Sequence, residues 1–118
     1  MSATTPTDPR KRLADVEAVF SALAHPARRQ ILLTIHFWDG TMRAGDVANR
    51  FGHSWPTTTR HLKVLVDAGL LSHERVGRES LYRLRRDRLQ VAEEWLDWFD
   101  KAPNSGKEKE RVLRMLSA

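Results

Sequence analysis

The sequence predicts a mainly α-helical domain with one small β-hairpin. Apolar residues recur at helical spacing along most of the chain. Two of the helical segments are separated only by a short turn that contains Gly52, and the pattern becomes extended after Gly69. The 118 residues are enough for one hydrophobic core, and 41% hydrophobic with 30% charged residues is typical of a globular domain.

Residues 1–8 are predicted to be a disordered lead, and a helix is predicted from Pro9 to Leu23. Asp8 is a favourable N-cap, and proline suits the first helical position because the N–H it lacks is not needed there. The apolar residues that follow at helical spacing make this helix amphipathic. They are Leu13, Val16, Val19, Phe20 and Leu23.

A second helix is predicted to begin at Pro26 and to run through His36. Asp39 and Gly40 supply its stop signal. Residues 41–42 are too few for periodicity to classify, although they could form an edge strand.

A helix-turn-helix is predicted next. A short helix fits residues 43–51, and the following helix fits residues 55–68. Proline disfavours the α conformation in the residue before it, so the second of these helices begins at Trp55 or Pro56. Its cap is then Ser54 or Trp55.

After Gly69 the composition favours a β-hairpin, with strands at residues 71–75 and 80–84 around Gly77 and Arg78. Its position directly after the helix-turn-helix makes it a candidate part of the same binding surface.

Helical spacing returns from Leu89 to Phe99. Residues 102–107 break this pattern, and residues 108–116 are either a short helix or a frayed tail. The predicted organisation is one domain over residues 9–101, followed by a linker and tail over residues 102–118.

The charge distribution favours a polyanionic partner. The formal net charge is +5 and the isoelectric point is near 10.2, which suits nucleic acid or an anionic membrane face. Residues 54–88 carry eight Lys and Arg against four Asp and Glu, so the excess lies in the middle third. The chain has no cysteine, which excludes disulfides and thiolate chemistry. No apolar run approaches the roughly 18 residues of a membrane span, and no signal peptide is apparent, so we expect a cytoplasmic protein.

The helix over residues 55–68 divides into two faces at 100° per residue. Its outer face offers hydroxyls and only positive charges near the N-terminal end. A Thr can contact a phosphate or a thymine methyl, and Arg can make a bidentate contact to guanine. The inner face holds Thr58, His61, Leu62 and Leu65, and the outer face holds Pro56, Thr57, Arg60, Lys63 and Val64, with Thr59 at the margin.

Each functional interpretation has a simpler alternative. The outer face could be solvated surface, and Trp55 could pack on residues 51–52 rather than project toward a sugar and phosphate. Arg75 and Arg78 on the hairpin could follow the DNA backbone or enter a minor groove, or they could be solvated turn charges. Arg83, Arg85, Arg86 and Arg88 extend the basic strip, with some of them expected to be ordinary surface residues.

Trp95, Trp98 and Phe99 form an apolar face with Leu89 and Leu96 that is too broad for one flank of a small domain. It could be the lid of a monomer core. Three aromatics within five residues instead favour a dimer contact with the first helix, where Val16 and Phe20 lie.

No catalytic, metal or cofactor site is predicted. The five histidines, at positions 25, 36, 53, 61 and 73, have no ligand spacing and no cysteine partners. The sequence has no nucleophile paired with a base and no glycine-rich phosphate loop. The carboxylates of the late helix fit a solvated face.

Several motifs together resemble the ArsR/SmtB-type winged-helix repressors over roughly residues 16–100. These are "ALAHPARRQIL", the "S-x-x-T-x-T-R" run that continues into "HLKVLVDAGLL", and the wing "R-x-GRE-x-LYRL". The resemblance implies a winged helix-turn-helix homodimer, built through its first and last helices, that binds a palindromic operator and represses transcription.

The resemblance also assigns residues. It places the DNA-reading helix at residues 54–68. Its metal motifs have no counterpart here, because residues 41–47 contain no cysteine and residues 87–100 contain no histidine. His25 stands where such sequences commonly place Asp as a helix cap. The implied DNA-contact positions are Ser54, Trp55, Thr57, Thr59, Arg60 and Lys63 in the helix, with Arg75, Gly77 and Arg78 in the wing.

The predicted function is therefore a sequence-specific repressor that does not sense metal through cysteines. Two alternatives stay open at this point. One is a non-specific architectural DNA-binding protein, and the other is a sensor of a metal or small-molecule effector with a non-standard site.

Overall fold

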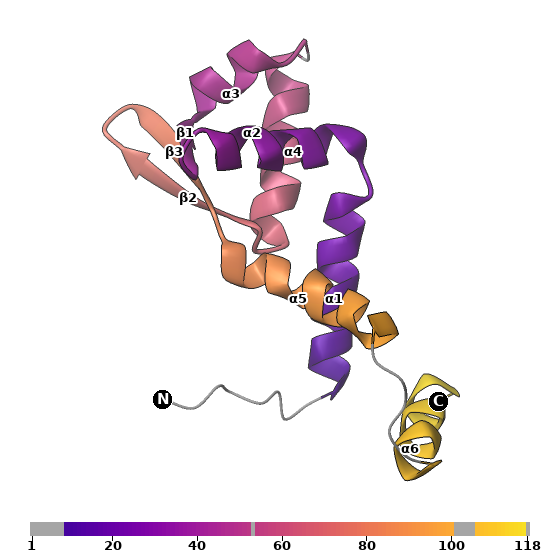
Figure 1. Cartoon of the computed structure of the whole chain (residues 1–118). Coiled ribbons are helices and arrows are strands. Elements are labelled where there is room, and N and C mark those ends of the chain that lie inside the picture. Colours follow the sequence, from indigo (N-terminus) through magenta and orange to yellow (C-terminus); the bar gives the residue numbers. More distant parts are fainter. Residues whose placement is uncertain (1–8, 53, 101–105, 118) are drawn as a thin grey trace.

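The computed structural model describes residues 9–52, 54–100 and 106–117. The predicted lead over residues 1–8 and the segment 101–105 lie outside the described residues. The elements in chain order are α1 (Pro9–Leu23), α2 (Pro26–Phe37), β1 (Thr41–Arg43), α3 (Ala44–Arg50), α4 (Trp55–Asp67), β2 (Leu71–Val76), β3 (Glu79–Leu84), α5 (Arg86–Asp97), the 3₁₀ turn η1 (Trp98–Asp100) and α6 (Gly106–Ser117) (Figure 1).

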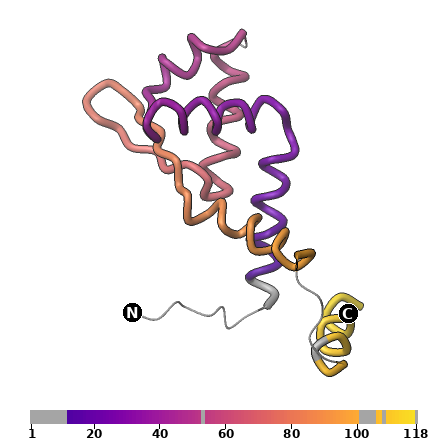
Figure 2. Tube along the Cα trace, viewed as in Figure 1, coloured from indigo at the N-terminus to yellow at the C-terminus, as the bar shows by residue number. Residues whose placement is uncertain are grey.

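Helices α2, α3 and α4 pack together, and the antiparallel sheet, in the order β1-β3-β2, extends beside them as a wing (Figure 1). Helix α1 lies against α5 below this unit, and α6 stands apart from both in the same view (Figure 2). Of the two alternatives for residues 108–116, the structure has a helix. No helix in the described part of the chain is long and apolar enough to cross a membrane.

One core joins the first helix, the helix-turn-helix and the sheet. Its most deeply buried members come from α1, α2, α3, α4, β1 and the chain around the start of β2. Helix α4 therefore cannot move without disturbing its neighbours in the core. The most deeply buried members are Val19, Ile31, Ile35, Met42, Val47, Leu62, Leu65, Leu70 and Leu71.

The starts of α2 and α4 depend on side-chain caps. The Nδ1 atom of His25 accepts the N–H of Ala27 at 3.1 Å, so this histidine fills the capping position that the resemblance implied. At α4 the cap is Ser54, whose Oγ accepts the N–H of Thr57 at 3.3 Å. The residues that follow the two caps are Pro26 and Trp55, and each helix carries proline within its first two positions.

Helix α3 is shorter than predicted, spanning Ala44–Arg50 rather than residues 43–51. Arg43 has an extended backbone and pairs with Leu81 across the sheet, which makes it the third residue of the edge strand. Phe51 is also extended. The tentative edge strand at residues 41–42 is therefore confirmed and is longer by one residue.

Boundaries of α4, the hairpin and α5 also differ from the predictions. Helix α4 ends at Asp67, one residue early, and each strand of the hairpin gains one residue next to the turn. Helix α5 begins at Arg86, before the first apolar residue that signalled it. It ends at Asp97, so Trp98 and Phe99 belong to a 3₁₀ turn rather than to the helix.

Arg88 ties the end of α4 to α1. Its Nε donates to the carbonyl oxygen of Ala68 at 2.8 Å, and its Nη2 donates to Oδ1 of Asp15 at 3.1 Å. Gly69 ends α4 with a φ of +81°, in the left-handed region that favours glycine. A Cβ at this position would lie 2.9 Å from the Arg88 Nε, so glycine is needed for both reasons.

Replacing Thr58 by valine should stabilise the fold. The side chain is 1% exposed, and its Oγ1 has no hydrogen-bond partner among the described residues. A buried hydroxyl without a partner is destabilising, so Thr58→Val should raise the free energy of unfolding by about 1 kcal/mol. Urea denaturation measures this, with the exposed neighbour Thr59→Val as a control that should change stability by less than about 0.5 kcal/mol. A destabilised Thr58→Val protein would contradict the assignment of an unsatisfied hydroxyl.

Candidate nucleic-acid interface

Helix α4 has the two faces that the sequence predicts. Thr58, Leu62 and Leu65 are buried, and His61 is half-buried beside them. The opposite side carries the exposed or half-buried side chains of the predicted outer face and its margin. Those exposed are Pro56, Thr59, Arg60 and Lys63, and those half-buried are Thr57 and Val64.

Two of the predicted contact residues already serve the helix. Besides capping the N–H of Thr57, the Ser54 hydroxyl donates to the Thr57 Oγ1 at 3.0 Å. The pair closes the start of α4, where backbone N–H groups and the positive end of the helix dipole favour an anion such as phosphate.

The predicted cations fall into two groups. Arg60, Arg75 and Arg78 are exposed, and in the described ranges none of them has an ion pair. Lys63 is different, since its Nζ lies 2.9 Å from Oδ2 of Asp67, one turn further along α4. These three exposed arginines are therefore available to a polyanion, whereas Lys63 already has an acidic partner on its own helix.

The wing is a tight hairpin. Arg75 pairs with Ser80 and Val76 pairs with Glu79, which leaves Gly77 and Arg78 as a two-residue turn. Gly77 has a φ of +63°. A positive φ at the first turn position is typical of a type II′ hairpin turn, which requires glycine there. Gly77 thus provides the backbone conformation that the turn requires, and Arg78 provides the positive charge at the tip of the wing.

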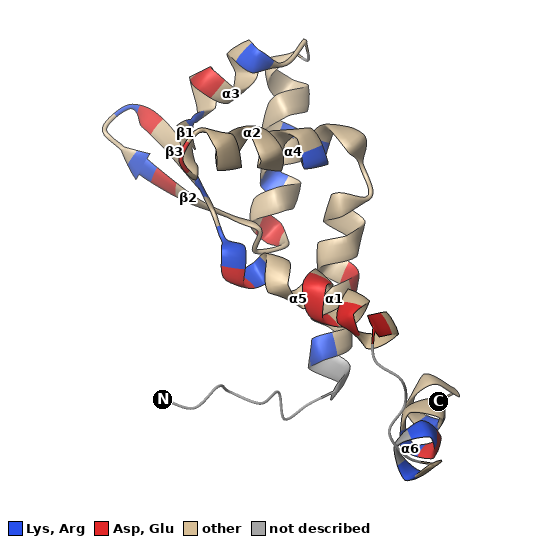
Figure 3. Cartoon of the chain, in the orientation of Figure 1, with Lys and Arg blue, Asp and Glu red and all other residues tan. Residues whose placement is uncertain are grey.

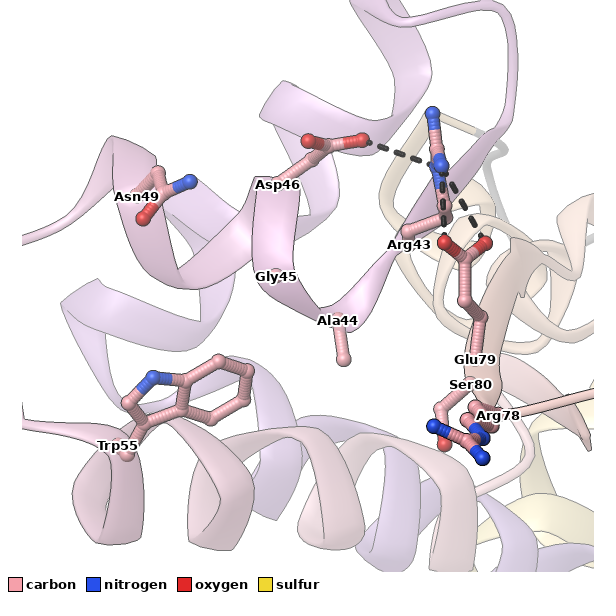
Figure 4. A pocket seen from close by; sticks show the side chains of 9 residues that line it. All are labelled: Arg43, Ala44, Gly45, Asp46, Asn49, Trp55, Arg78, Glu79 and Ser80. Atoms are coloured by element: carbon pink, nitrogen blue, oxygen red, sulfur yellow. Dashed lines mark hydrogen bonds and ion pairs between the residues drawn. The ribbon is translucent and has the colours of Figure 1, made fainter.

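A hollow of about 450 Å³ separates the start of α4 from the wing (Figure 4). Trp55 stands on one side of it and Arg78 on the other, with the first turn of α3 above (Figure 4). Trp55 is 55% exposed, and its ring lines this space. The lining residues are Arg43, Ala44, Gly45, Asp46, Asn49, Trp55, Arg78, Glu79 and Ser80.

Arg43 connects the wing to α3, a role that sequence reasoning missed. Its Nη1 lies 3.0 Å from Oε1 and 3.3 Å from Oε2 of Glu79, and its Nε lies 3.5 Å from Oδ2 of Asp46. The hydrogen bond and charge of Glu79 raise the pKa of Arg43 above its ordinary value. Arg43 and Glu79 are 36 positions apart, and no sequence periodicity connects residues at that distance. Only Asp46, three residues after Arg43, could have suggested part of this group of charges.

The basic strip after the wing is engaged within the domain. Arg83 donates to the Thr41 hydroxyl at 3.4 Å, and Arg86 donates to Nδ1 of His36 at 3.1 Å. Arg85 pairs with Asp87 at 3.2 Å and, through this hydrogen bond, lowers the pKa of that carboxyl group. With Arg88 bound to α1 and α4, these four arginines are tied to their own chain.

The residues predicted to form a dimer interface differ in exposure. Phe99 is 74% exposed and Trp98 is also exposed. Trp95 packs edge-on against Phe20, with ring centroids 5.3 Å apart. The ring centroids of Trp95 and Phe99 are 5.1 Å apart. Val16 is only 8% exposed and belongs to the core of its own chain. It therefore offers a partner almost no surface.

In the residues that the structure describes, no three His, Asp or Glu side chains come close enough together to hold a metal ion. The features that could form a binding site in this domain are instead the helix-turn-helix, the wing and the hollow between them.

Residues 23–74 match a family model described as a helix-turn-helix domain. The chain is 37% identical over 87 residues to the transcriptional repressor SdpR of Bacillus subtilis, a match that covers 73% of this chain and 94% of the relative. It is 31% identical over 78 residues to a biofilm growth-associated repressor of Agrobacterium fabrum, covering 66% of this chain and 65% of the relative.

Solved structures share the fold. An ArsR-like transcriptional regulator from Rhodococcus sp. RHA1 is 28% identical and superimposes with a TM-score of 0.64, covering 88% of this chain and 91% of that one. This chain belongs to the ArsR/SmtB-type family of winged helix-turn-helix repressors. A second ArsR-family neighbour, from Mycobacterium bovis, is described as a homodimeric winged helix-turn-helix DNA-binding domain. It is 25% identical with a TM-score of 0.64, over 84% of this chain and 91% of its own.

Within this ArsR-type fold, Ser54 offers a way to separate capping from DNA contact. Ser54→Ala should destabilise the protein by about 1 kcal/mol, because the cap of α4 is lost. Ser54→Asp should keep the stability, since Asp is an equally good N-cap, but its negative charge should weaken DNA binding at low salt. Urea denaturation and fluorescence anisotropy with duplex DNA measure the two effects.

Ser117→Asp is the matched control, because it adds the same charge on α6, away from α4 (Figure 1). If Ser54→Asp bound DNA as tightly as this control, the start of α4 would not face the DNA.

Proposed function

We propose that the chain acts as a homodimeric repressor that reads a two-fold symmetric DNA operator. The observation that carries the proposal is the combination of an exposed face on α4 with a wing across the hollow from it, each carrying arginines without an ion pair in the described residues. The membership of a repressor family supports the same function.

In this proposal α4 enters the major groove. Arg60 is placed to make a bidentate contact to guanine, and Thr57 and Thr59 present methyl and hydroxyl groups to base edges or phosphates. Ser54, Trp55 and Lys63 lie at positions suited to the sugar-phosphate backbone.

The hollow between α4 and the wing then receives the DNA sugar-phosphate backbone that separates the major groove from the adjacent minor groove. Arg75 and Arg78 reach that minor groove from the wing, while Gly77 allows the backbone to turn closely there. The hollow of about 450 Å³ between the Trp55 ring and Arg78 supports this arrangement (Figure 4).

The dimer rests on the apolar surface around Phe20, Trp95, Trp98 and Phe99. A two-fold pairing of α1 and α5, with Trp98 and Phe99 at the edge of the contact, would bury side chains that a single chain leaves in water. Two copies of α4 would then enter successive major grooves, with half-sites about one helical turn apart. The homodimeric description of the Mycobacterium bovis neighbour supports the assignment.

Selection of bound duplexes from a random DNA pool tests the function directly. We expect enrichment of one sequence with two inverted half-sites whose centres are about 10 base pairs apart. A pool that binds without enrichment would instead favour a non-specific architectural protein. DNA release on addition of a metal or a small molecule would favour the sensor alternative.

Replacing Arg60 should reduce both affinity and selectivity. Arg60→Ala should cost about 1–3 kcal/mol on the selected duplex and much less on random DNA, because a base contact is lost. Arg111→Ala on α6 removes the same charge from an exposed site away from this surface and is the control, compared at protein concentrations that keep both variants dimeric. Anisotropy titrations on both duplexes measure the difference. An equal loss on the two DNAs would make Arg60 a phosphate contact and would contradict its role in base reading.

A further inference from the structure

Helix α6 has an apolar face that its own chain leaves in water. Leu113 and Leu116 are 60% and 70% exposed, and Met115 is exposed beside them. The opposite face carries charged side chains, among them an ion pair in which Arg114 Nη2 lies 3.6 Å from Oε2 of Glu110. Helices of about 12 residues are marginal in water without a surface to pack against. The 12 residues of α6 therefore call for a partner surface.

A complementary apolar surface lies at the end of α5. Leu96, Trp98 and Phe99 are all exposed, and we call them the η1 surface. Within the described residues, thirteen large apolar side chains are exposed, and eight of them lie on α1, α5, η1 or α6. The unpaired apolar area of the molecule is thus concentrated near this end rather than scattered.

The charges around the two surfaces are opposite. Residues 93–100 carry four Asp and Glu and no Lys or Arg, whereas residues 106–117 carry four Lys and Arg against two Glu. Figure 3 shows the acidic residues gathered where α5 ends beside α1. Arg12 pairs with Glu94, and in the described residues Glu93, Asp97 and Asp100 have no ion pair. The η1 surface is therefore apolar with an acidic rim, and α6 is apolar with basic flanks.

We propose that α6 of one chain packs its apolar face on the η1 surface of a second copy of the chain. The proposal rests on the homodimer of the proposed function. In the single chain α6 stands apart from its own α5 and η1 (Figures 1 and 2). A two-fold axis that pairs the α1 and α5 helices brings the η1 surface of each copy to the same seam, so each α6 begins next to its partner.

This exchange makes two identical contacts per dimer. Each covers the apolar side chains of α6 and sets basic residues against Glu93, Asp97 and Asp100 of the other copy. The η1 surface and α6 thereby extend the α1–α5 interface rather than form a separate site. The strength of the dimer then depends on α6, whereas the DNA-reading surface of each chain does not depend on α6.

Disulfide trapping tests the contact, since the natural sequence contains no cysteine. Chains of different length, one with Phe99→Cys and one with Leu116→Cys, are mixed and oxidised. We expect a cross-linked heterodimer between the two lengths. Arg114→Cys, on the polar face of α6, replaces Leu116→Cys in the control and should give little product.

Two outcomes of the trapping experiment would overturn the proposal. One is equal cross-linking by Leu116→Cys and Arg114→Cys. The other is a Phe99→Cys/Leu116→Cys double variant that closes within one chain while the mixed single variants do not cross-link. The second result would place α6 on its own η1 surface.

Analytical ultracentrifugation gives an independent measure. The Leu113→Glu/Leu116→Glu double variant should raise the dimer dissociation constant at least about tenfold, because apolar contacts are lost and acidic groups meet acidic groups. Arg114→Gln should change it less than about threefold. Above its dissociation constant, the double variant should bind the selected duplex as the wild type does.

These readouts separate the two proposals. An unchanged dimer constant in the double variant, with DNA binding intact, would overturn the role of α6 alone. Absence of DNA binding by a dimeric wild type would overturn the proposed function alone. If the double variant lost binding to anionic vesicles while its dimer constant stayed the same, α6 would be a membrane-surface helix and the proposal would be wrong.

Discussion

The guanidinium of Arg88 is the contact on which the architecture depends. It belongs to α5, donates to the carbonyl oxygen of Ala68, the C-cap residue of α4, and pairs with Asp15 of α1. Gly69 leaves the space that its side chain occupies. Because α4 also buries Thr58, Leu62 and Leu65 in the common core, its direction is fixed relative to α1 and α5. In the proposed dimer this connection sets the angle at which the two recognition helices meet DNA.

Ion pairing within the domain decides which positive charges remain for a partner. Arg83, Arg85, Arg86 and Arg88 bind groups of their own chain, and Arg43 holds the wing through Glu79. The arginines without an ion pair in the described residues include those of α4 and the wing tip. A net charge of +5 is modest, so its placement on one surface matters more than its size.

Local features of this fold could be predicted, and contacts between distant residues could not. The cap at Ser54, the hairpin and the buried face of α4 follow from residues a few positions apart, where spacing and turn chemistry are informative, whereas the cap at His25 was implied by the family resemblance. The Arg43–Glu79 and Arg88–Asp15 pairs join residues 36 and 73 positions apart, for which the sequence has no period. The apolar stripe over residues 108–116 did not decide between a short helix and a frayed tail, because amphipathicity alone does not say whether a helix has a surface to pack on.

In the proposed function, the exposed face of α4 and the wing tip form the surface that binds DNA. Amide chemical shifts of the labelled protein, recorded during titration with the selected duplex, test this at every residue. We expect the largest changes over residues 54–63 and 75–78, with small changes on the exposed side of α2 and on α6. Changes centred on α2 or α6, with residues 54–63 unaffected, would contradict it.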